Sequence, residues 1–172
     1  GLYGLPIGMG HRGPAGGQPL VDHDTERYGD LFHPGEPACF GMFTQAAQVV
    51  GPHRLSAVDP MGGHRVERVI ATGGSQSAMK LVAYFNAVHS IEPVVDGALL
   101  SVWEGRAPRL EEGPVGYGGW RTRIRDDLDI PIVVVNSEFE AQPVAVVGAG
   151  DLDNLRIWEG AGTPHGGNRR GP

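Results

Sequence analysis

The stretch Val66-Glu67-Arg68-Val69-Ile70-Ala71-Thr72-Gly73-Gly74-Ser75-Gln76-Ser77-Ala78 decides the fold of this chain. A short apolar run, which predicts a strand from Val66 to Thr72, reaches two glycines and a serine, and a helix-compatible stretch follows. This is the layout of a nucleophile elbow, in which a strand turns sharply into a helix with a serine at the apex. The glycines give the strained turn the room that it needs. The usual signature is Gly-x-Ser-x-Gly, and here Ser77, another small residue, replaces the last glycine.

The residues after the serine predict a helix. Residues 76–88 contain no proline or glycine, and their apolar positions recur at helical spacing. One apolar face is formed by Ala78, Leu81, Val82, Phe85 and Val88. We therefore expect a helix over Gln76 to Val88 that packs on a sheet. Its first N–H groups should face the site of developing negative charge beside Ser75.

Two further elements follow in the order serine, acid, histidine. Residues 130–135 form a nearly continuous run of β-branched residues, as expected for a parallel strand that is buried on both faces. It leads into Asn136-Ser137-Glu138-Phe139-Glu140, which places two carboxylates just beyond the strand. Residues 155–159 predict another strand, followed by a glycine-rich loop with His165 at its tip. Chemistry in open α/β sheets collects at the carboxyl ends of the strands, where these residues are expected.

Several motifs in this order resemble those of a known family. They are Asp24-Thr25-Glu26-Arg27-Tyr28-Gly29-Asp30-Leu31, His33-Pro34-Gly35, Gly74-Ser75-Gln76-Ser77-Ala78, Asn136-Ser137-Glu138 and Trp158-Glu159-Gly160-Ala161-Gly162-Thr163-Pro164-His165. From about Asp22 to His165 the chain resembles the α/β-hydrolase domain-containing family with a Gly-x-Ser-Gln-Ser elbow. The resemblance implies an α/β-hydrolase fold, a mostly parallel sheet with flanking helices. It also implies a Ser-acid-His hydrolase that acts on carboxylic esters, for which we expect no cofactor.

The resemblance gives roles to individual residues. Ser75 is the expected nucleophile, and His165 the base that takes its proton. Glu138 and Glu140 compete for the third position: the broader fold sets the acid a turn beyond the strand, which favours Glu140, whereas Glu138 belongs to the matched motif. The backbone N–H of Gln76 is the expected oxyanion donor. Two other residues, Gly74 and His33, are expected to contact the substrate.

Composition narrows the possible partners. The chain has 172 residues with 40% hydrophobic content, enough for one core, and its net charge of −6 argues against nucleic acid. No apolar stretch approaches membrane-spanning length, so we expect no membrane partner. The aspartates at 126, 127 and 129 would suggest a metal, but no histidine or cysteine lies at ligand spacing, so no metal site is assigned. The expected partner is a small-molecule ester.

The chain is expected to form a single domain over residues 1–172. Residues 1–36 predict an irregular loop, Pro37–Val50 a helix, Asp96–Trp103 a strand, and Gly105–Gly119 an irregular lid or substrate-binding insertion. An α/β-hydrolase normally has several strands before its elbow, and the resemblance places them upstream of Gly1. The backbone N–H that serves as the second oxyanion donor should also lie upstream of Gly1. We therefore expect a C-terminal portion that lacks the N-terminal strands.

Three functions remain open from the sequence. The first is an ester hydrolase, and the second is an acyltransferase that uses the same triad. The third is a non-catalytic fragment or pseudoenzyme. Labelling of Ser75 with a fluorophosphonate probe separates the third function from the other two, and product analysis with added alcohol separates the first two.

Overall fold

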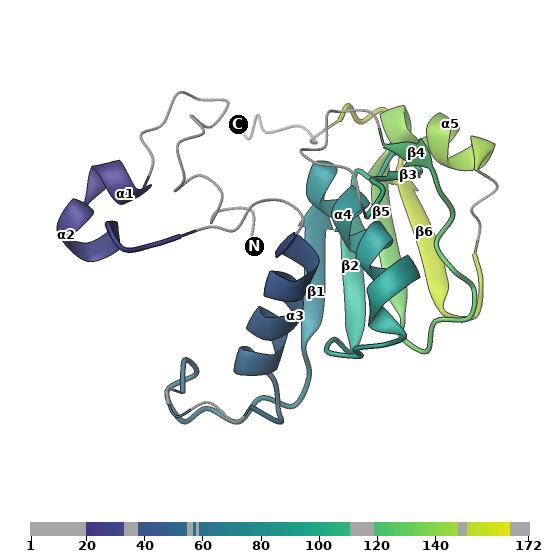
Figure 1. The fold of residues 1–172 in the computed structure, drawn as a ribbon. Helices are drawn as coiled ribbons and strands as arrows, with labels where there is room; N and C mark the ends of the chain where they lie inside the picture. Colours follow the sequence, from purple (N-terminus) through teal and green to yellow (C-terminus); the bar gives the residue numbers. More distant parts are fainter. Residues whose placement is uncertain are drawn as a thin grey trace.

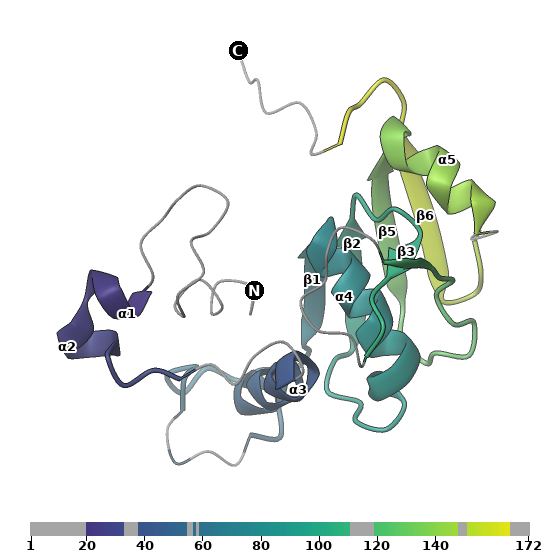
Figure 2. The same cartoon turned by 45° about the horizontal axis from the view of Figure 1, so that its top comes forward.

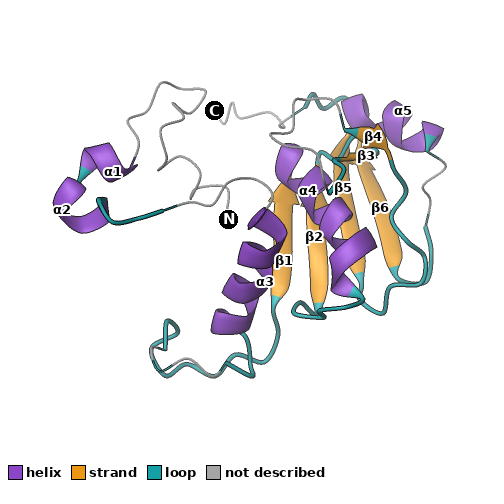
Figure 3. Ribbon diagram, viewed as in Figure 1, coloured by secondary structure: helices purple, strands orange, loops and turns teal. Residues whose placement is uncertain are grey.

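The computed structural model describes most of the chain after its first nineteen residues. The described residues are 20–32, 38–54, 57, 59–110, 119–147 and 151–165. Within them, four parallel strands form the main sheet in the order β1-β2-β5-β6. The strands are β1 (Ile70–Gly74), β2 (Gly97–Ser101), β5 (Ile132–Ser137) and β6 (Leu155–Gly160). This parallel sheet with flanking helices confirms the predicted α/β class (Figure 3).

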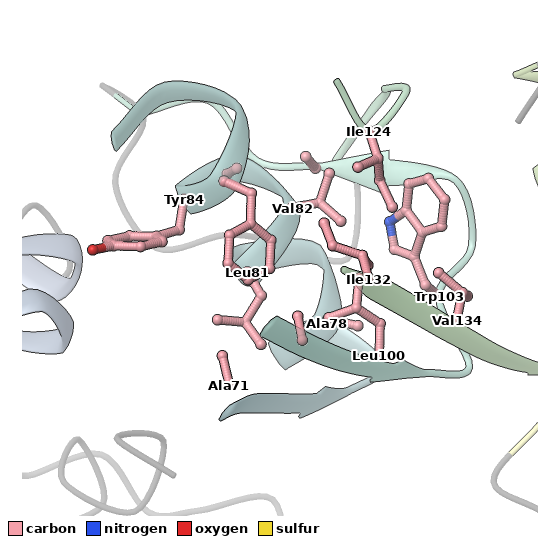
Figure 4. Close-up of a cluster of buried hydrophobic side chains, with 14 of the residues drawn as sticks. Ala71, Ala78, Leu81, Val82, Tyr84, Leu100, Trp103, Ile124, Ile132 and Val134 are labelled. Carbon is pink, nitrogen blue, oxygen red and sulfur yellow. The ribbon is translucent and has the colours of Figure 1, made fainter. Parts of the chain in front are cut away.

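One helix covers the central part of the sheet and forms the core with it. α4 (Gln76–Tyr84) continues into a π-helical turn, Phe85–His89, so the helix that was predicted to end at Val88 changes its winding near its end. Figure 4 shows side chains of α4 meeting those of the strands. The labelled contributors are Ala71, Ala78, Leu81, Val82, Tyr84, Leu100, Trp103, Ile124, Ile132 and Val134, all buried. This packing fixes α4 relative to the carboxyl ends of the strands.

Two other helices flank this core. α3 (Cys39–Val50) packs on Tyr84 through Phe40 and Phe43, and the Thr44 hydroxyl lies 2.8 Å from the Tyr84 hydroxyl. This helix was predicted from Pro37, which lies outside the described residues. α5 (Glu138–Val146) follows β5 directly and lies toward the β6 side of the sheet (Figure 1).

Side chains on the two faces of the sheet differ in how deeply they are buried. Ile132 and Val134 point to the α4 side and are buried, whereas Val135 on the other side is 39% exposed. Other exposed apolar residues on that opposite side are Ile70, Leu99 and Trp158, at 55%, 44% and 62%. The prediction of a strand buried on both faces is therefore wrong within the described residues. These residues also supply no strand partner for the outer edge of β1.

Several boundaries differ from the sequence prediction. β1 begins at Ile70 rather than Val66, because Val69 already bonds Asp96 through its N–H (2.8 Å) and its carbonyl (2.7 Å) outside the ladder. β2 ends at Ser101 because Val102 has a φ of +47°, which breaks the extended backbone. β5 and β6 each run further than predicted, to Ser137 and Gly160.

Two segments predicted as irregular contain short elements. The first holds α1 (Leu20–His23) and α2 (Thr25–Tyr28), which lie apart from the sheet (Figures 1 and 2). The second holds β3 (Arg106–Ala107), which pairs in an antiparallel ladder with β4 (Trp120–Arg121), directly after the segment. Elements this short carry no periodic signal in the sequence. The intervening residues 111–118 lie outside the description.

Candidate active site

Ser75 occupies the strained turn between β1 and α4. Its φ of +52° and ψ of −118° are unusual for a residue with a side chain, and such strain costs roughly 1–3 kcal/mol. The turn is held by a 2.9 Å hydrogen bond from the Ser75 N–H to the Ser101 carbonyl at the end of β2. A Cβ at Gly73 would lie 2.9 Å from the Ser77 carbonyl carbon, and one at Gly74 would lie 2.9 Å from Ser101 Oγ. The backbone of α4 therefore leaves no room for a Cβ at Gly73, whereas a Cβ at Gly74 would require the Ser101 hydroxyl to move.

A second strained residue lies at the next strand end. Val102, with φ +47°, is β-branched, a residue type that rarely adopts positive φ. The Asn136 side chain holds the backbone directly after it, accepting from the Trp103 N–H at 2.8 Å and donating to the Trp103 carbonyl at 3.0 Å. Asn136 is 3% exposed, so these bonds form in the interior. The ends of β1, β2 and β5 are thus tied together beside Ser75.

His165 reaches Ser75 from the loop that follows β6. The imidazole Nε2 lies 3.1 Å from Ser75 Oγ, and Nδ1 lies 2.5 Å from Glu140 Oε1. In the neutral tautomer that carries its proton on Nδ1, the ring donates to the carboxylate and accepts from the serine hydroxyl. Ser75, His165 and Glu140 therefore form one continuous hydrogen-bonded row.

The two competing glutamates occupy different environments. Glu140 is fully buried in the first turn of α5, and its second oxygen, Oε2, accepts from Ser137 Oγ at 2.5 Å and from the Ser137 N–H at 3.0 Å. Glu138 is exposed, and its Oε2 accepts from the Gly162 N–H at 2.5 Å. Glu140 therefore contacts the imidazole, and Glu138 contacts the backbone of the histidine loop.

The contacts of Glu140 keep it ionised. Burial raises the pKa of Glu140, but the hydrogen bonds from Ser137 Oγ, His165 Nδ1 and the Ser137 N–H outweigh burial and hold this pKa below its ordinary value. A buried carboxylate in this state stabilises a positive charge on the imidazole beside it. The row from Ser75 to Glu140 thus supports transfer of a proton onto Nε2.

The remaining expected site residues lie at or near this row, with one exception. Gln76 is the first residue of α4, and the first intrahelical bond runs from the Met79 N–H to the Ser75 carbonyl at 3.1 Å. The N–H groups of the first turn thus point out of the helix end beside Ser75. Gly74 is the exposed last residue of β1. His33 lies outside the described residues.

Sequence reasoning missed three residues that the structure adds to this region. Ser137 fixes Glu140, Asn136 holds the turn after β2, and the ring of Phe139 meets the His165 ring edge-on with centroids 5.9 Å apart. The spacing Ser137-x-x-Glu140 is a signature of a helix start in which the glutamate folds back to the N-cap. This spacing was the feature of the sequence that could have predicted the inward-folded position of Glu140.

Two tryptophans that flank the expected lid segment, residues 105–119, have different surroundings. Trp103 is fully buried, and its Nε1–H donates to the Arg106 carbonyl at 2.7 Å, so it is part of the core. Trp120 is 56% exposed, with the Arg109 guanidinium 4.3 Å from its ring centroid. Tyr117 lies outside the described residues.

The described part of the chain offers neither a metal cluster nor a membrane-spanning helix. It contains no cluster of three or more histidine, cysteine, aspartate or glutamate side chains that fits a metal ion. None of its helices has both the length and the apolar character that crossing a bilayer requires.

Comparison with known proteins identifies a family for the chain. Neither the curated proteins nor the solved structures gave a match. The family model of an alpha/beta hydrolase domain matches residues 8–172, nearly the whole chain and all of the residues that form the row. The chain therefore belongs to this alpha/beta hydrolase domain family.

Proposed function

We propose that this protein is a serine hydrolase that cleaves carboxylic esters through an acyl-enzyme intermediate. Ser75 is the nucleophile, His165 the general base and Glu140 the acid that orients the imidazole. The observation that carries the proposal is the hydrogen-bonded row, with 3.1 Å from Ser75 Oγ to His165 Nε2 and 2.5 Å from His165 Nδ1 to Glu140 Oε1. Membership of an alpha/beta hydrolase family indicates hydrolase chemistry and supports it.

The first half of the reaction acylates the serine. Ser75 Oγ forms a bond to the ester carbonyl carbon while its proton passes to His165 Nε2. The carbonyl oxygen becomes an oxyanion, which the backbone N–H of Gln76 stabilises at the positive end of α4. The bond to the leaving alkoxide then breaks, and His165 returns the proton to that oxygen.

The second half releases the acid. His165 takes a proton from water, the resulting hydroxide attacks the acyl carbon, and the bond to Ser75 Oγ breaks as the serine recovers its proton. Throughout, Glu140 keeps the proton of the imidazole on Nδ1 and stabilises the imidazolium. Its buried position and lowered pKa suit this role because it stays ionised at neutral pH.

Covalent labelling tests the proposal directly. We expect a fluorophosphonate probe to label the full-length protein at Ser75, and Ser75→Ala to abolish labelling. Hydrolysis of short-chain p-nitrophenyl esters should fall by roughly 10⁴-fold or more in this variant. Full activity of Ser75→Ala would rule out this serine as the nucleophile.

A matched control uses the other serine of the motif. Ser77 lies two residues further along, in the first turn of α4, and the fold commonly has glycine there. Ser77→Gly should therefore retain labelling and turnover. If Ser77→Gly loses as much labelling and turnover as Ser75→Ala, Ser75 was wrongly assigned as the nucleophile. An ester rather than an acid product in the presence of added alcohol would identify an acyltransferase instead.

A further inference from the structure

The described residues of the loop that carries His165, residues 161–165, make few hydrogen bonds to the rest of the described structure. Past Gly160, the last residue of β6, the hydrogen bonds that leave its described residues go to three side chains, those of Ser75, Glu138 and Glu140. A fourth hydrogen bond, from Thr163 Oγ1 to the Gly160 carbonyl, only returns to the end of the adjoining strand. Two of the three external bonds are made by the His165 ring itself. The backbone of the loop is therefore held by Glu138 alone among these side chains.

The contact of Glu138 is well suited to hold a loop. Its side-chain oxygen Oε2 accepts from the Gly162 N–H at 2.5 Å, which joins the start of α5 directly to the backbone of the loop. Gly162 has a φ of +71°, a conformation in which any other residue would be strained. The bond therefore holds the turn at Gly162, three residues before His165. Because Glu138 is the first residue of α5, the bond ties this turn to the helix that also carries Glu140.

We infer that Glu138 is a positioning residue, which holds the loop through Gly162 so that the His165 ring stays between Ser75 and Glu140. The inference rests on the proposed function, because it gives Glu138 a task only if His165 is the base. Glu140 orients the ring, and Glu138 holds the backbone that carries the ring. One turn of α5 thus fixes the histidine at two points.

A purely structural role predicts different behaviour. A carboxylate in the first turn of a helix also interacts favourably with the helix dipole, and that effect needs charge but no particular reach. Positioning needs an acceptor oxygen at the distance of Gly162, with or without charge. Glu138→Gln keeps the reach and loses the charge, whereas Glu138→Asp keeps the charge and is one methylene too short.

The experiment compares kcat and KM of these variants in the full-length protein with a p-nitrophenyl ester. We expect Glu138→Asp and Glu138→Ala to lower kcat about tenfold with little change in KM, and Glu138→Gln to stay within about twofold of the wild type. Glu159→Gln is the matched control, since Glu159 is an exposed carboxylate on β6, directly before the loop. It should leave kcat unchanged. The thermal midpoint of each variant shows that it is folded.

Combination with His165→Ala separates positioning from a general effect. A loop without the imidazole has nothing to position, so Glu138→Asp should cause no further loss in that background. The inference is overturned if Glu138→Asp keeps wild-type kcat, if Glu138→Gln loses as much as Glu138→Ala, or if the losses add in the double variant. An active Ser75→Ala protein would instead overturn the proposed function. The two failures are therefore distinguishable.

Discussion

Ser75 and His165 meet across 3.1 Å, but they are held there by different kinds of contact. Ser75 sits between a strand and a helix of the core, and its own N–H donates to the Ser101 carbonyl. Gly73, two residues before it, lies so close to the backbone of α4 that a Cβ would not fit. His165 lies on a loop beyond the sheet, and its ring is held by side chains 25 and 90 positions away in the sequence.

Substitutions that disturb the contacts of Ser75 and those that disturb the contacts of His165 should have different effects. A change on the serine side alters the packing of β1 against α4, so its main cost should be stability. A change on the histidine side removes a hydrogen bond from a partly exposed loop, so its main cost should be activity. Separate measurements of unfolding and of turnover therefore test the comparison.

The largest effect on the histidine side is expected from Glu140→Gln. The amide fits the same space but can hold the imidazole in the wrong tautomer, so kcat should fall by about 10⁴-fold. Steady-state kinetics with a p-nitrophenyl ester measures this loss. Glu138→Gln is the control and should cost little. A crippled Glu138→Gln with an active Glu140→Gln would reverse the assignment of the acid, and two active variants would place the acid outside this pair.

The matching change on the serine side is Gly73→Ala. The added Cβ would lie 2.8 Å from Leu81 Cδ1, 2.9 Å from the Ser77 carbonyl carbon and 3.0 Å from the Ala78 nitrogen. Two of these atoms are backbone, so α4 must shift, and overpacking of this kind costs about 1–3 kcal/mol. We expect the thermal midpoint to fall by several degrees.

An open position in another helix provides the control for Gly73→Ala. Gly41 is an exposed residue of α3, and a Cβ there meets nothing within 4 Å. Gly41→Ala should therefore stabilise the protein, by up to about 1 kcal/mol, because alanine favours the helix more than glycine does. If Gly73→Ala is as stable as the wild type, the close packing of β1 and α4 does not hold Ser75.

The same contrast explains what the sequence could predict. The turn at Ser75 depends on glycines and on helical spacing within a few residues, and the sequence predicted it together with the four strands of the sheet. Its strand was predicted to begin four residues too early, at Val66, because the Asp96 side chain, distant in sequence, accepts from the Val69 N–H. Local patterns thus located the elements, whereas long-range contacts set their ends.

Contacts of the histidine loop were harder to predict because they join distant segments. The sequence placed Glu138 and Glu140 together but left their tasks open. The two glutamates differ in role because the Ser137 hydroxyl holds the Glu140 side chain in the interior, whereas Glu138 faces the loop. The Ser-x-x-Glu spacing carried that information. In contrast, no local pattern predicted the strained backbone of Val102. Nor did one predict that the side chain of Asn136 would hold the backbone of Trp103, 33 positions away in the sequence.

The smallest expected effect concerns Ser137, and it depends on pH. The folded-state pKa of Glu140 lies below its ordinary value, so the ionised carboxylate stabilises the fold at pH values above its unfolded-state pKa. That stabilisation is lost as the pH falls through the unfolded-state value, about 4.3, toward the lower folded-state pKa. Ser137→Ala removes the 2.5 Å bond from Oγ to Glu140 Oε2, so it should raise the folded-state pKa.

Urea unfolding of Ser137→Ala from about pH 7 to about pH 3 measures this effect. We expect the variant to be about 1 kcal/mol less stable than the wild type near pH 7, with the difference shrinking as Glu140 becomes protonated. Ser101→Ala is the control, because the Ser101 hydroxyl faces the Gly73 carbonyl, 3.5 Å away, which does not titrate. Its difference from the wild type should be the same at each pH. A constant difference for Ser137→Ala as well would mean that Ser137 acts only as a helix cap, and that the charge of Glu140 is held by His165 and the backbone instead.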